Sequence, residues 1–409
     1  MQLEVSPVRG FQDYLPSLSL KREKIRRIVQ NNFKLFGFLP IETPAIEFDE
    51  LMRSDSISDE EDIISERFKL KDKSGRNLGL RYDLSLQLSR VLKENLGIKL
   101  PFMCYQIGNV FRDTTVKTGR TKQFCQCSVE IIGDESINAD IECVAAISSV
   151  FEKLGINTEI MINNKKLLGS IIESVQIDDK KQVMKELDKV EKLGLDIVKA
   201  NLRRYASANQ IITLFRIFEK NLGFFKENAF DGANEVEELI KLCKLYSIDA
   251  KFNPLLINGL NYYTGNIFEA RLKDKNIGIA GGGRYDNSLG RYLGKKMPAV
   301  GFSFSLEALT EICEPQIAKL KIEKFPTIVL ISEKKDSETI KLLKRMRKNN
   351  ISCLAKFGKN LEPLDLNEIP FSLQINKEDL AKGKFKLKDN KTGEEKLLTE
   401  KQLINKFGK

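Results

Sequence analysis

Two alternating strands joined by a polar loop constrain the fold of this chain more than any other feature. The segments FMCYQIGNVFRD (102–113) and KQFCQCSVEIIGD (122–134) alternate apolar and polar side chains, which is the two-residue period of a β-strand. The loop between them, TTVKTGRT (114–121), contains a glycine and two basic residues. Since parallel strands need a longer connection, this pair predicts a long antiparallel hairpin.

Further segments predict more strands of this sheet and helices around it. Residues 18–36 carry apolar side chains at helical spacing, and residues 165–250 are nearly all helical in pattern and highly charged. Other strands are expected at NYYTGNIFEARL (261–272), IGIAGGGRYD (277–286) and AVGFSFSLEAL (299–309). We therefore predict an α+β domain at residues 1–320, whose antiparallel sheet is flanked by helices and interrupted by a helical insertion at about 165–250.

The hydrophobic pattern restarts between Pro315 and Pro326. After it, TIVLIS, SETIKLLKRMRKNN and ISCLAKF read as strand, helix and strand, and FSLQIN and KFKLKD add further strands. These segments predict a second, small α/β domain at residues 326–409.

The glycine run GGGR at 281–284 is not a Walker A loop, because it lacks the G-K-[ST] ending. It is a weak signal for a phosphate cradle. A close-packing turn that opens onto Tyr285 and Asp286 is the better interpretation.

The absence of histidine excludes several kinds of chemistry. Neither a Ser-His-Asp triad, a Cys-His pair nor a histidine metal ligand can be formed. The seven cysteines are scattered, and the C-x-C pair at Cys125 and Cys127 has no second pair at zinc spacing, so we expect reduced buried thiols and no metal site. Catalysis would have to use carboxylates, tyrosines, Arg and Lys, backbone donors or the substrate itself.

The net charge of +10 favours an anionic partner, nucleic acid first, although a lysine-rich proteome explains it equally well. No apolar run approaches the roughly 18 residues of a membrane span. The N-terminus shows no signal-peptide pattern. We expect a cytoplasmic protein that does not enter a membrane.

Several segments together resemble one known family. These are RGFQDYLP, GFLPIETPAIEF, LRYDLS, VFRD followed by GRTKQFCQCSVEIIGD, GLNYYTG, GGGRYDNSLG and AVGFSFSLE. Their order and spacing resemble those of histidyl-tRNA synthetases, which are class II aminoacyl-tRNA synthetases. Over essentially the whole chain, the resemblance implies a six- or seven-stranded antiparallel sheet, a C-terminal domain like those that bind anticodons, an obligate homodimer, and ATP-driven charging of histidine onto its tRNA.

The resemblance also assigns roles to single residues. Arg112 would hold the α-phosphate of ATP as the catalytic cation, and Arg120 and Glu307 would also bind ATP. Pro44 would lie in the dimer interface. The histidine pocket would be formed by Asp83, Ser85, Gln126, Glu130, Tyr262, Tyr263 and Tyr285. These types suit the ligand, because carboxylates match its amine and ring N–H, and tyrosines offer hydroxyls and an aromatic wall.

The chain departs from the family at positions that matter for adenylation. Two of the family's three arginines are replaced, by Asn258 and Ala308, and Thr114 stands where an acid is usual. Losing one preorganised charge donor typically lowers a rate by about 10²–10³. A nearby lysine, Lys117 or Lys122, could substitute only as a point charge. The segment at 357–376 is also shorter than the family's, which bears on anticodon reading.

Three functions are compatible with these residues. The first is a histidine–tRNA ligase that uses ATP with Mg²⁺. The second is a catalytically degenerate paralogue that binds histidine, such as the regulatory subunit of ATP phosphoribosyltransferase, with a histidine-biosynthesis catalytic subunit as its partner. The third is a tRNA-binding module without charging. A second, intact synthetase in the same genome would favour the last two.

Overall fold

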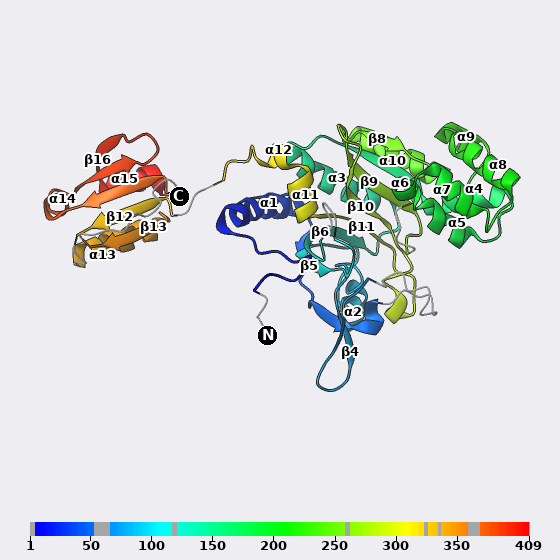
Figure 1. Ribbon diagram of the computed structural model, residues 1–409, viewed down its shortest axis with the longest axis horizontal. Coiled ribbons are helices and arrows are strands. Elements are labelled where there is room, and N and C mark those ends of the chain that lie inside the picture. Colours follow the sequence, from blue (N-terminus) through cyan, green and yellow to red (C-terminus); the bar gives the residue numbers. More distant parts are fainter. Residues whose placement is uncertain are drawn as a thin grey trace. The chain divides into compact units, whose positions relative to one another are not determined.

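The computed structural model describes residues 5–52, 66–116, 121–257, 262–322, 326–333, 337–358 and 369–408. The chain divides into two compact units, Met1–Leu320 and Lys321–Lys409. The larger unit is drawn in blue to yellow in Figure 1 and the smaller in orange to red. Among the helices of the described ranges, none is both long and apolar enough to cross a membrane.

An eight-stranded sheet is the centre of the larger unit, in the order β1-β5-β6-β11-β10-β9-β7-β8. In that order the strands are Leu39–Pro40, Phe102–Phe111, Gln123–Ile132, Ala299–Ser305, Gly278–Arg284, Asn266–Leu272, Thr158–Asn164 and Ala250–Phe252. The six strands from β5 to β7 pair antiparallel, and only the two short outer strands pair parallel. The expected antiparallel sheet is confirmed, and the two short outer strands bring its number of strands to eight.

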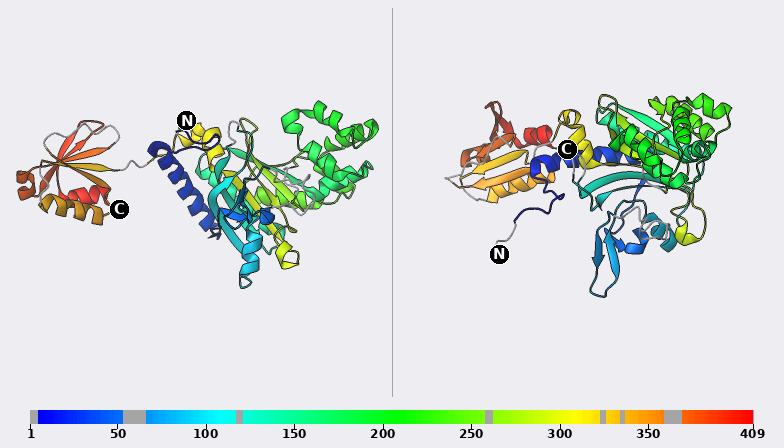
Figure 2. Two further views of the ribbon diagram at one scale, coloured as in Figure 1. Left: turned by 60° about the horizontal axis from the view of Figure 1, so that its bottom comes forward. Right: turned by 45° about the vertical axis from the view of Figure 1, so that its right-hand side comes forward.

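The predicted hairpin is β5 and β6, which pair from Phe102 with Ile132 to Phe111 with Gln123. Its strand period separates two faces. Cys125, Cys127 and Val129 lie in the hydrophobic core that includes helices α1 (Pro16–Leu35) and α3 (Ile137–Lys153), while Gln126 and Glu130 line a cavity. Figures 1 and 2 show α1 and α3 beside this sheet. Helices α11 (Leu306–Ile312) and α12 (Glu314–Ile317) follow β11 directly.

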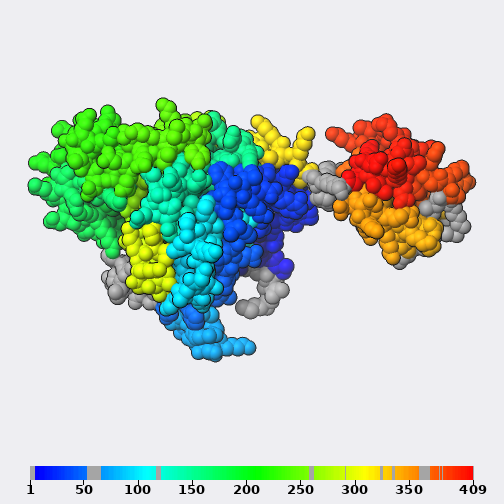
Figure 3. Space-filling view, turned by 180° about the vertical axis from the view of Figure 1, so that it is seen from behind, coloured from blue at the N-terminus to red at the C-terminus, as the bar shows by residue number. Residues whose placement is uncertain are grey.

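A three-stranded sheet and a block of helices complete the larger unit. The small sheet has the order β2-β4-β3, with strands Ile46–Phe48, Asn77–Leu80 and Lys69–Lys71, and α2 (Leu88–Glu94) follows it. The helical block, green in Figures 1 and 3, lies between β7 and β8 in the chain. Its helices α4 to α10 are Lys165–Ser174, Lys180–Leu187, Val190–Leu193, Leu195–Leu202, Ala208–Phe218, Leu222–Glu227 and Ala233–Leu245.

The smaller unit contains a five-stranded sheet in the order β13-β12-β14-β15-β16. The strands β12 to β16 are Ile328–Ser332, Cys353–Phe357, Phe371–Ile375, Lys384–Asp389 and Glu395–Thr399, and helices α13 to α15 are Ser337–Lys348, Lys377–Lys382 and Glu400–Phe407. Strand β12 pairs parallel with both its neighbours, as the strand–helix–strand pattern predicts. The smaller unit has its own hydrophobic core, which includes Leu330, Met346 and Leu403.

The glycine run lies inside strand β10, so the prediction of a turn is wrong. The glycines are required by close packing instead. A Cβ on Gly282 would lie 2.2 Å from the carbonyl oxygen of Gly301 on β11, and one on Gly301 would lie 1.9 Å from the Glu130 carboxylate on β6. A side chain at position 282 would therefore collide with the backbone of β11, and one at position 301 would collide with the Glu130 side chain.

Replacing Gly282 with alanine is expected to destabilise the larger unit by about 2 kcal/mol or more, because a backbone atom cannot move aside as a flexible side chain can. The matched control is Gly97→Ala, whose Cβ would meet nothing within 4 Å. Urea unfolding of both variants measures the difference. Equal unfolding midpoints for the two variants would contradict this account of β10.

Candidate active site

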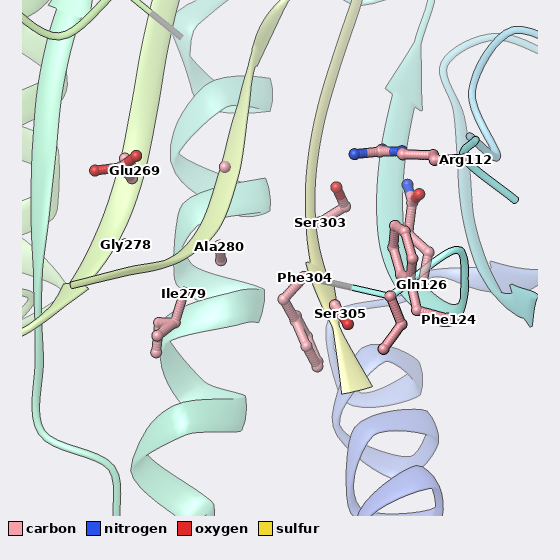
Figure 4. Close-up of a pocket in the computed structure, with 12 residues that line it drawn as sticks. Arg112, Phe124, Gln126, Glu269, Gly278, Ile279, Ala280, Ser303, Phe304 and Ser305 are labelled. Atoms are coloured by element: carbon pink, nitrogen blue, oxygen red, sulfur yellow. The ribbon is translucent and has the colours of Figure 1, made fainter. Parts of the chain in front are cut away.

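Two adjoining cavities open on one face of the eight-stranded sheet. The smaller has a volume of about 180 Å³ and the larger about 330 Å³. Arg112, Gln126, Gly281 and Ser303 line both, so the cavities share a wall. Figure 4 shows the larger cavity in front of the strands, with α3 behind them. The site is thus built on the sheet itself and can hold two ligands side by side.

The smaller cavity collects the predicted histidine pocket. Its walls include Asp83, Ser85, Gln126, Glu130, Tyr262, Tyr263 and Tyr285, together with Arg112. These residues come from segments that are far apart in the chain. The fold therefore brings together all seven residues that the resemblance assigned to one pocket.

Glu130 is the buried centre of this cavity. Its Oε1 accepts a hydrogen bond from the Ser85 hydroxyl at 2.6 Å, and its Oε2 accepts one from the Tyr285 hydroxyl. Burial raises the pKa of Glu130 to about 8, although both hydrogen bonds act in the opposite direction. In the absence of a ligand, this carboxyl therefore carries a proton at neutral pH.

Asp83 is the second buried carboxyl of the cavity. Its Oδ1 accepts hydrogen bonds from the backbone N–H groups of Ser85 and Leu86, at 3.2 and 3.1 Å. Burial raises the pKa of Asp83, opposed by these N–H groups and by the charge of Arg112. Two carboxyls withdrawn from water favour a cationic ligand, which would add to the positive charge that Arg112 supplies.

Three tyrosines form the aromatic part of the wall. Tyr262 lies 4.9 Å from Tyr263 and 5.6 Å from Tyr285, measured between ring centroids. Burial raises the pKa of all three hydroxyls, so they stay neutral and can donate hydrogen bonds. Such a wall suits a small planar ligand with polar edges.

Gln126 supplies a buried acceptor on the shared wall. Its Oε1 is buried and has no hydrogen-bond partner among the described residues. Buried polar atoms are nearly always hydrogen-bonded, and an orphaned one at a cavity is accounted for by a ligand or a water molecule that donates to it.

Arg112 follows strand β5 and lies on the wall that the two cavities share. Its guanidinium stacks over Tyr82 at 4.4 Å and Phe124 at 5.0 Å, and its Nε donates to the carbonyl oxygen of Tyr82 at 3.3 Å. Figure 4 shows the side chain above Ser303 and Gln126. Stacking fixes a positive charge between the two ligand positions, where a reaction between them would take place.

Glu307 was expected to bind ATP, but it is not among the described residues that line the two cavities. Its Oε1 pairs with Arg22 at 2.7 Å and accepts from the Tyr14 hydroxyl at 3.1 Å, and its Oε2 accepts from the Cys125 backbone N–H at 2.8 Å. Glu307 therefore ties α11 to α1 and β6.

Two of the departures from the family, Ala308 and Thr114, lie within the described residues. Ala308 is in the first turn of α11, where its N–H donates to the Ser305 hydroxyl at 3.1 Å. Thr114 is buried and donates to Glu66 at 3.1 Å. Lys122 forms an ion pair with Asp113. Neither Thr114 nor Lys122 is among the residues that line the two cavities.

Three residues named from the sequence lie outside the described ranges. They are Arg120, Lys117 and Asn258. Pro44 lies within them and is exposed, two residues before β2.

Sequence reasoning missed part of the larger cavity. Phe124, Glu269, Ser303 and Ser305 line it, and none was singled out. The alternation within NIFEARL was a usable signal, because it places Glu269 and Arg271 on one face of their strand.

Comparison with known proteins agrees with this geometry. The model of the family described as Histidyl-tRNA synthetase matches residues 10–309. Histidine–tRNA ligase 1 of Bacillus cereus is 33% identical over 418 residues, which cover 96% of this chain and 95% of that protein. The structure of histidyl-tRNA synthetase from Nostoc sp. PCC 7120 has a TM-score of 0.82 at 24% identity, covering 99% of this chain and 100% of that one.

A further solved structure has the same fold. It is described as an ATP phosphoribosyltransferase regulatory subunit/histidyl-tRNA synthetase from Bacillus halodurans, with a TM-score of 0.75 at 20% identity, covering 91% of this chain and 99% of that one. The structural neighbours confirm the predicted α+β synthetase fold. At such identities they show the fold alone.

Glu130 makes the stability of the empty protein depend on pH. Its pKa of about 8 in the folded protein lies above the roughly 4.3 of an unfolded glutamate, so between these values the folded state holds a proton that the unfolded state has lost. Stability from this group is therefore complete below about pH 4.3 and falls as pH rises through 8. Glu130→Gln mimics the protonated form and removes this fall.

We expect the free energy of unfolding of Glu130→Gln to exceed that of the native protein by little at pH 5 and by a few kcal/mol at pH 8. Urea unfolding across this range, without ligand, measures the difference, and Glu219→Gln serves as an exposed control. A constant difference between native and Glu130→Gln protein at all pH values would show that Glu130 is already ionised when buried.

Proposed function

The chain belongs to the histidyl-tRNA synthetase family, and from that premise we propose that it is a histidine–tRNA ligase, which activates histidine with ATP and transfers it to its tRNA. The observation that carries the proposal is the pair of cavities with Arg112 on their shared wall. One cavity has the size and polarity for histidine, and the other has room for a nucleotide.

The smaller cavity suits histidine by charge and by hydrogen bonding. The amino acid brings a cationic α-amine and an imidazole with one donor and one acceptor. Asp83 and Glu130 offer carboxyl groups, Gln126 offers an acceptor without a partner among the described residues, and three tyrosines form an aromatic wall: Tyr262, Tyr263 and Tyr285. An apolar amino acid of the same size would leave these buried groups unpaired, so the site would reject it.

Adenylation requires the histidine carboxylate to attack the α-phosphate of ATP and expel pyrophosphate. The protein contributes position and positive charge to such a step. Arg112 lies where both ligands meet, and its stacked guanidinium can stabilise negative charge that develops on the α-phosphate oxygens. Phe124 and Phe304 give the larger cavity apolar surface suited to the base.

Mg²⁺ fits this site as a companion of the nucleotide. Glu269 is the one carboxylate among the described residues of the larger cavity, and it pairs with Arg271; no cluster of three or more Cys, Asp and Glu side chains suited to a metal ion occurs within the described ranges, so phosphate oxygens and water would supply most of the ligands. Mg²⁺ is usually held by one or two carboxylates together with phosphate oxygens and water. Bound with ATP, it would neutralise phosphate charge that Arg112 alone cannot.

The assembly implied by this function is a homodimer that binds tRNA. The small sheet beside Pro44 exposes Ile46 and Phe48, both at 49%, and Leu70 at 38%, as an interface with a second copy would require. The positive charge of the chain suits the tRNA backbone, and the smaller unit would contact the anticodon arm. The protein would act in the cytoplasm.

A histidine-binding paralogue without turnover is the second candidate. One observation favours it: among the described residues that line the larger cavity, Arg112 is the sole cation. A protein that senses histidine, alone or with a histidine-biosynthesis catalytic subunit, needs the smaller cavity and not the larger one.

Histidine-dependent exchange of pyrophosphate into ATP separates the two candidates. We expect exchange with the native protein, reduced about 10²–10³-fold in Arg112→Ala and unchanged in Arg345→Ala, since Arg345 pairs with Glu400 in the smaller unit. The double variant Asn258→Arg with Ala308→Arg restores the two family arginines.

The results have opposite meanings for the ligase proposal. Exchange by the native protein supports it. Absence of native exchange, with histidine bound in calorimetry and exchange gained by the double variant, would identify a binding protein that lost activation at those two positions.

A further inference from the structure

The wall of the larger cavity carries a negative charge that a nucleotide must meet. Glu269 on β9 lines this cavity, and it is the one carboxylate among the described lining residues. Figure 4 shows its side chain at the edge formed by β9 and β10. An unpaired carboxylate there would repel the phosphates of ATP, so the neutralisation of Glu269 bears directly on nucleotide binding.

Arg271 neutralises Glu269 from two residues further along the same strand. Its Nε donates to Glu269 Oε1, and its side chain is only 9% exposed. Burial raises the pKa of Glu269, and the charge of Arg271 is the largest effect that opposes this rise. Arg271 is not among the residues that line the cavity. Its influence on a bound nucleotide would therefore pass through Glu269.

Arg271 also contacts the helical insertion. Its Nη2 donates to Glu191 on α6, and its Nη1 donates to the Asn276 side chain at 3.4 Å. The Glu191 side chain is 68% exposed, whereas that of Glu269 is 22% exposed. The arginine thus joins a partly buried carboxylate on the cavity wall to a solvated one on the insertion. Because water screens Glu191, the pairing with Glu269 has the greater consequence for the cavity.

We propose that Arg271 is a positioning residue for the nucleotide: it neutralises Glu269 and fixes its carboxylate against the wall of the larger cavity, so that this wall accepts a polyphosphate. The inference rests on the proposed function, because it assigns ATP to this cavity. It adds a cationic residue that acts from outside the cavity lining, in a chain that resembles its family but has Asn258 and Ala308 where two family arginines are usual.

Calorimetric titration of the full-length protein with ATP and Mg²⁺ tests the assignment. Arg271→Met leaves Glu269 unpaired, and we expect roughly tenfold weaker ATP binding. In the double variant Glu269→Gln with Arg271→Met there is no charge left to neutralise, and binding should return to within about threefold of the native value. Arg345→Met, which removes an arginine from an ion pair in the smaller unit, is the matched control.

Glu191→Gln distinguishes charge neutralisation from attachment of the insertion. It leaves Arg271 paired with Glu269 and removes a competing negative charge, so ATP binding should be unchanged or up to about threefold tighter. Histidine binding, titrated on each variant, reports whether the smaller cavity is still folded. If Arg271→Met folds poorly, Arg271→Lys serves as a second test. It keeps the positive charge, so we expect it to retain most of the ATP affinity.

Three results would overturn the inference. They are native ATP affinity in folded Arg271→Met, no recovery in the double variant, and a loss in Glu191→Gln as large as that in Arg271→Met. The last would mean that the arginine acts by holding the insertion. A native protein that binds histidine but no ATP would instead contradict the ligase proposal, and the inference with it.

Discussion

The site depends on a carboxyl group buried in the middle of a β-sheet. Glu130 projects from β6 toward Gly301 on β11, its partner in the strand register, and a Cβ at Gly301 would lie 1.9 Å from the carboxylate. Removing a carboxylate from water is costly, and Ser85 and Tyr285 offset only part of that cost with their hydrogen bonds. A ligand that donates hydrogen bonds or brings positive charge to Glu130 would offset the rest of this desolvation cost.

Residues on the neighbouring strands make room for the Glu130 side chain and hold the sheet around it in place. Gly301 leaves the space that the Glu130 carboxylate occupies, and Gly282 leaves room for the carbonyl oxygen of Gly301. Arg284, at the end of β10, is buried in an ion pair with Asp140 on α3 and donates to the carbonyl oxygens of Asp134 and Ser136. Arg284 therefore links the end of β10 to helix α3, and Tyr285, which lines the smaller cavity, is the next residue.

The sequence predicts the fold where local periodicity dominates and fails where long-range contacts decide. Alternation in β5 and β6 is a property of each strand, so the hairpin could be predicted from it. GGGR was misread as a turn because glycine is common in turns and because its close neighbour, Gly301, is distant in sequence. The pairing of Glu307 with Arg22 joins residues 285 positions apart, and no local pattern could predict it. The same holds for Arg271 and Glu191, whose partnership depends on how the insertion folds back onto β9.

The two cavities differ in how much of their chemistry the described residues supply. The smaller cavity has carboxyls, tyrosines and an amide oxygen without a partner among the described residues, and all of them line one small space. The larger cavity has one stacked cation, Arg112, opposite one carboxylate, Glu269. Binding a polyphosphate there requires positive charge from elsewhere, and the sources that we propose are Mg²⁺ bound with the nucleotide and the neutralisation of Glu269 by Arg271. Recognition of the amino acid and activation by the nucleotide are therefore separable properties of this fold, because each depends on residues that the other does not need.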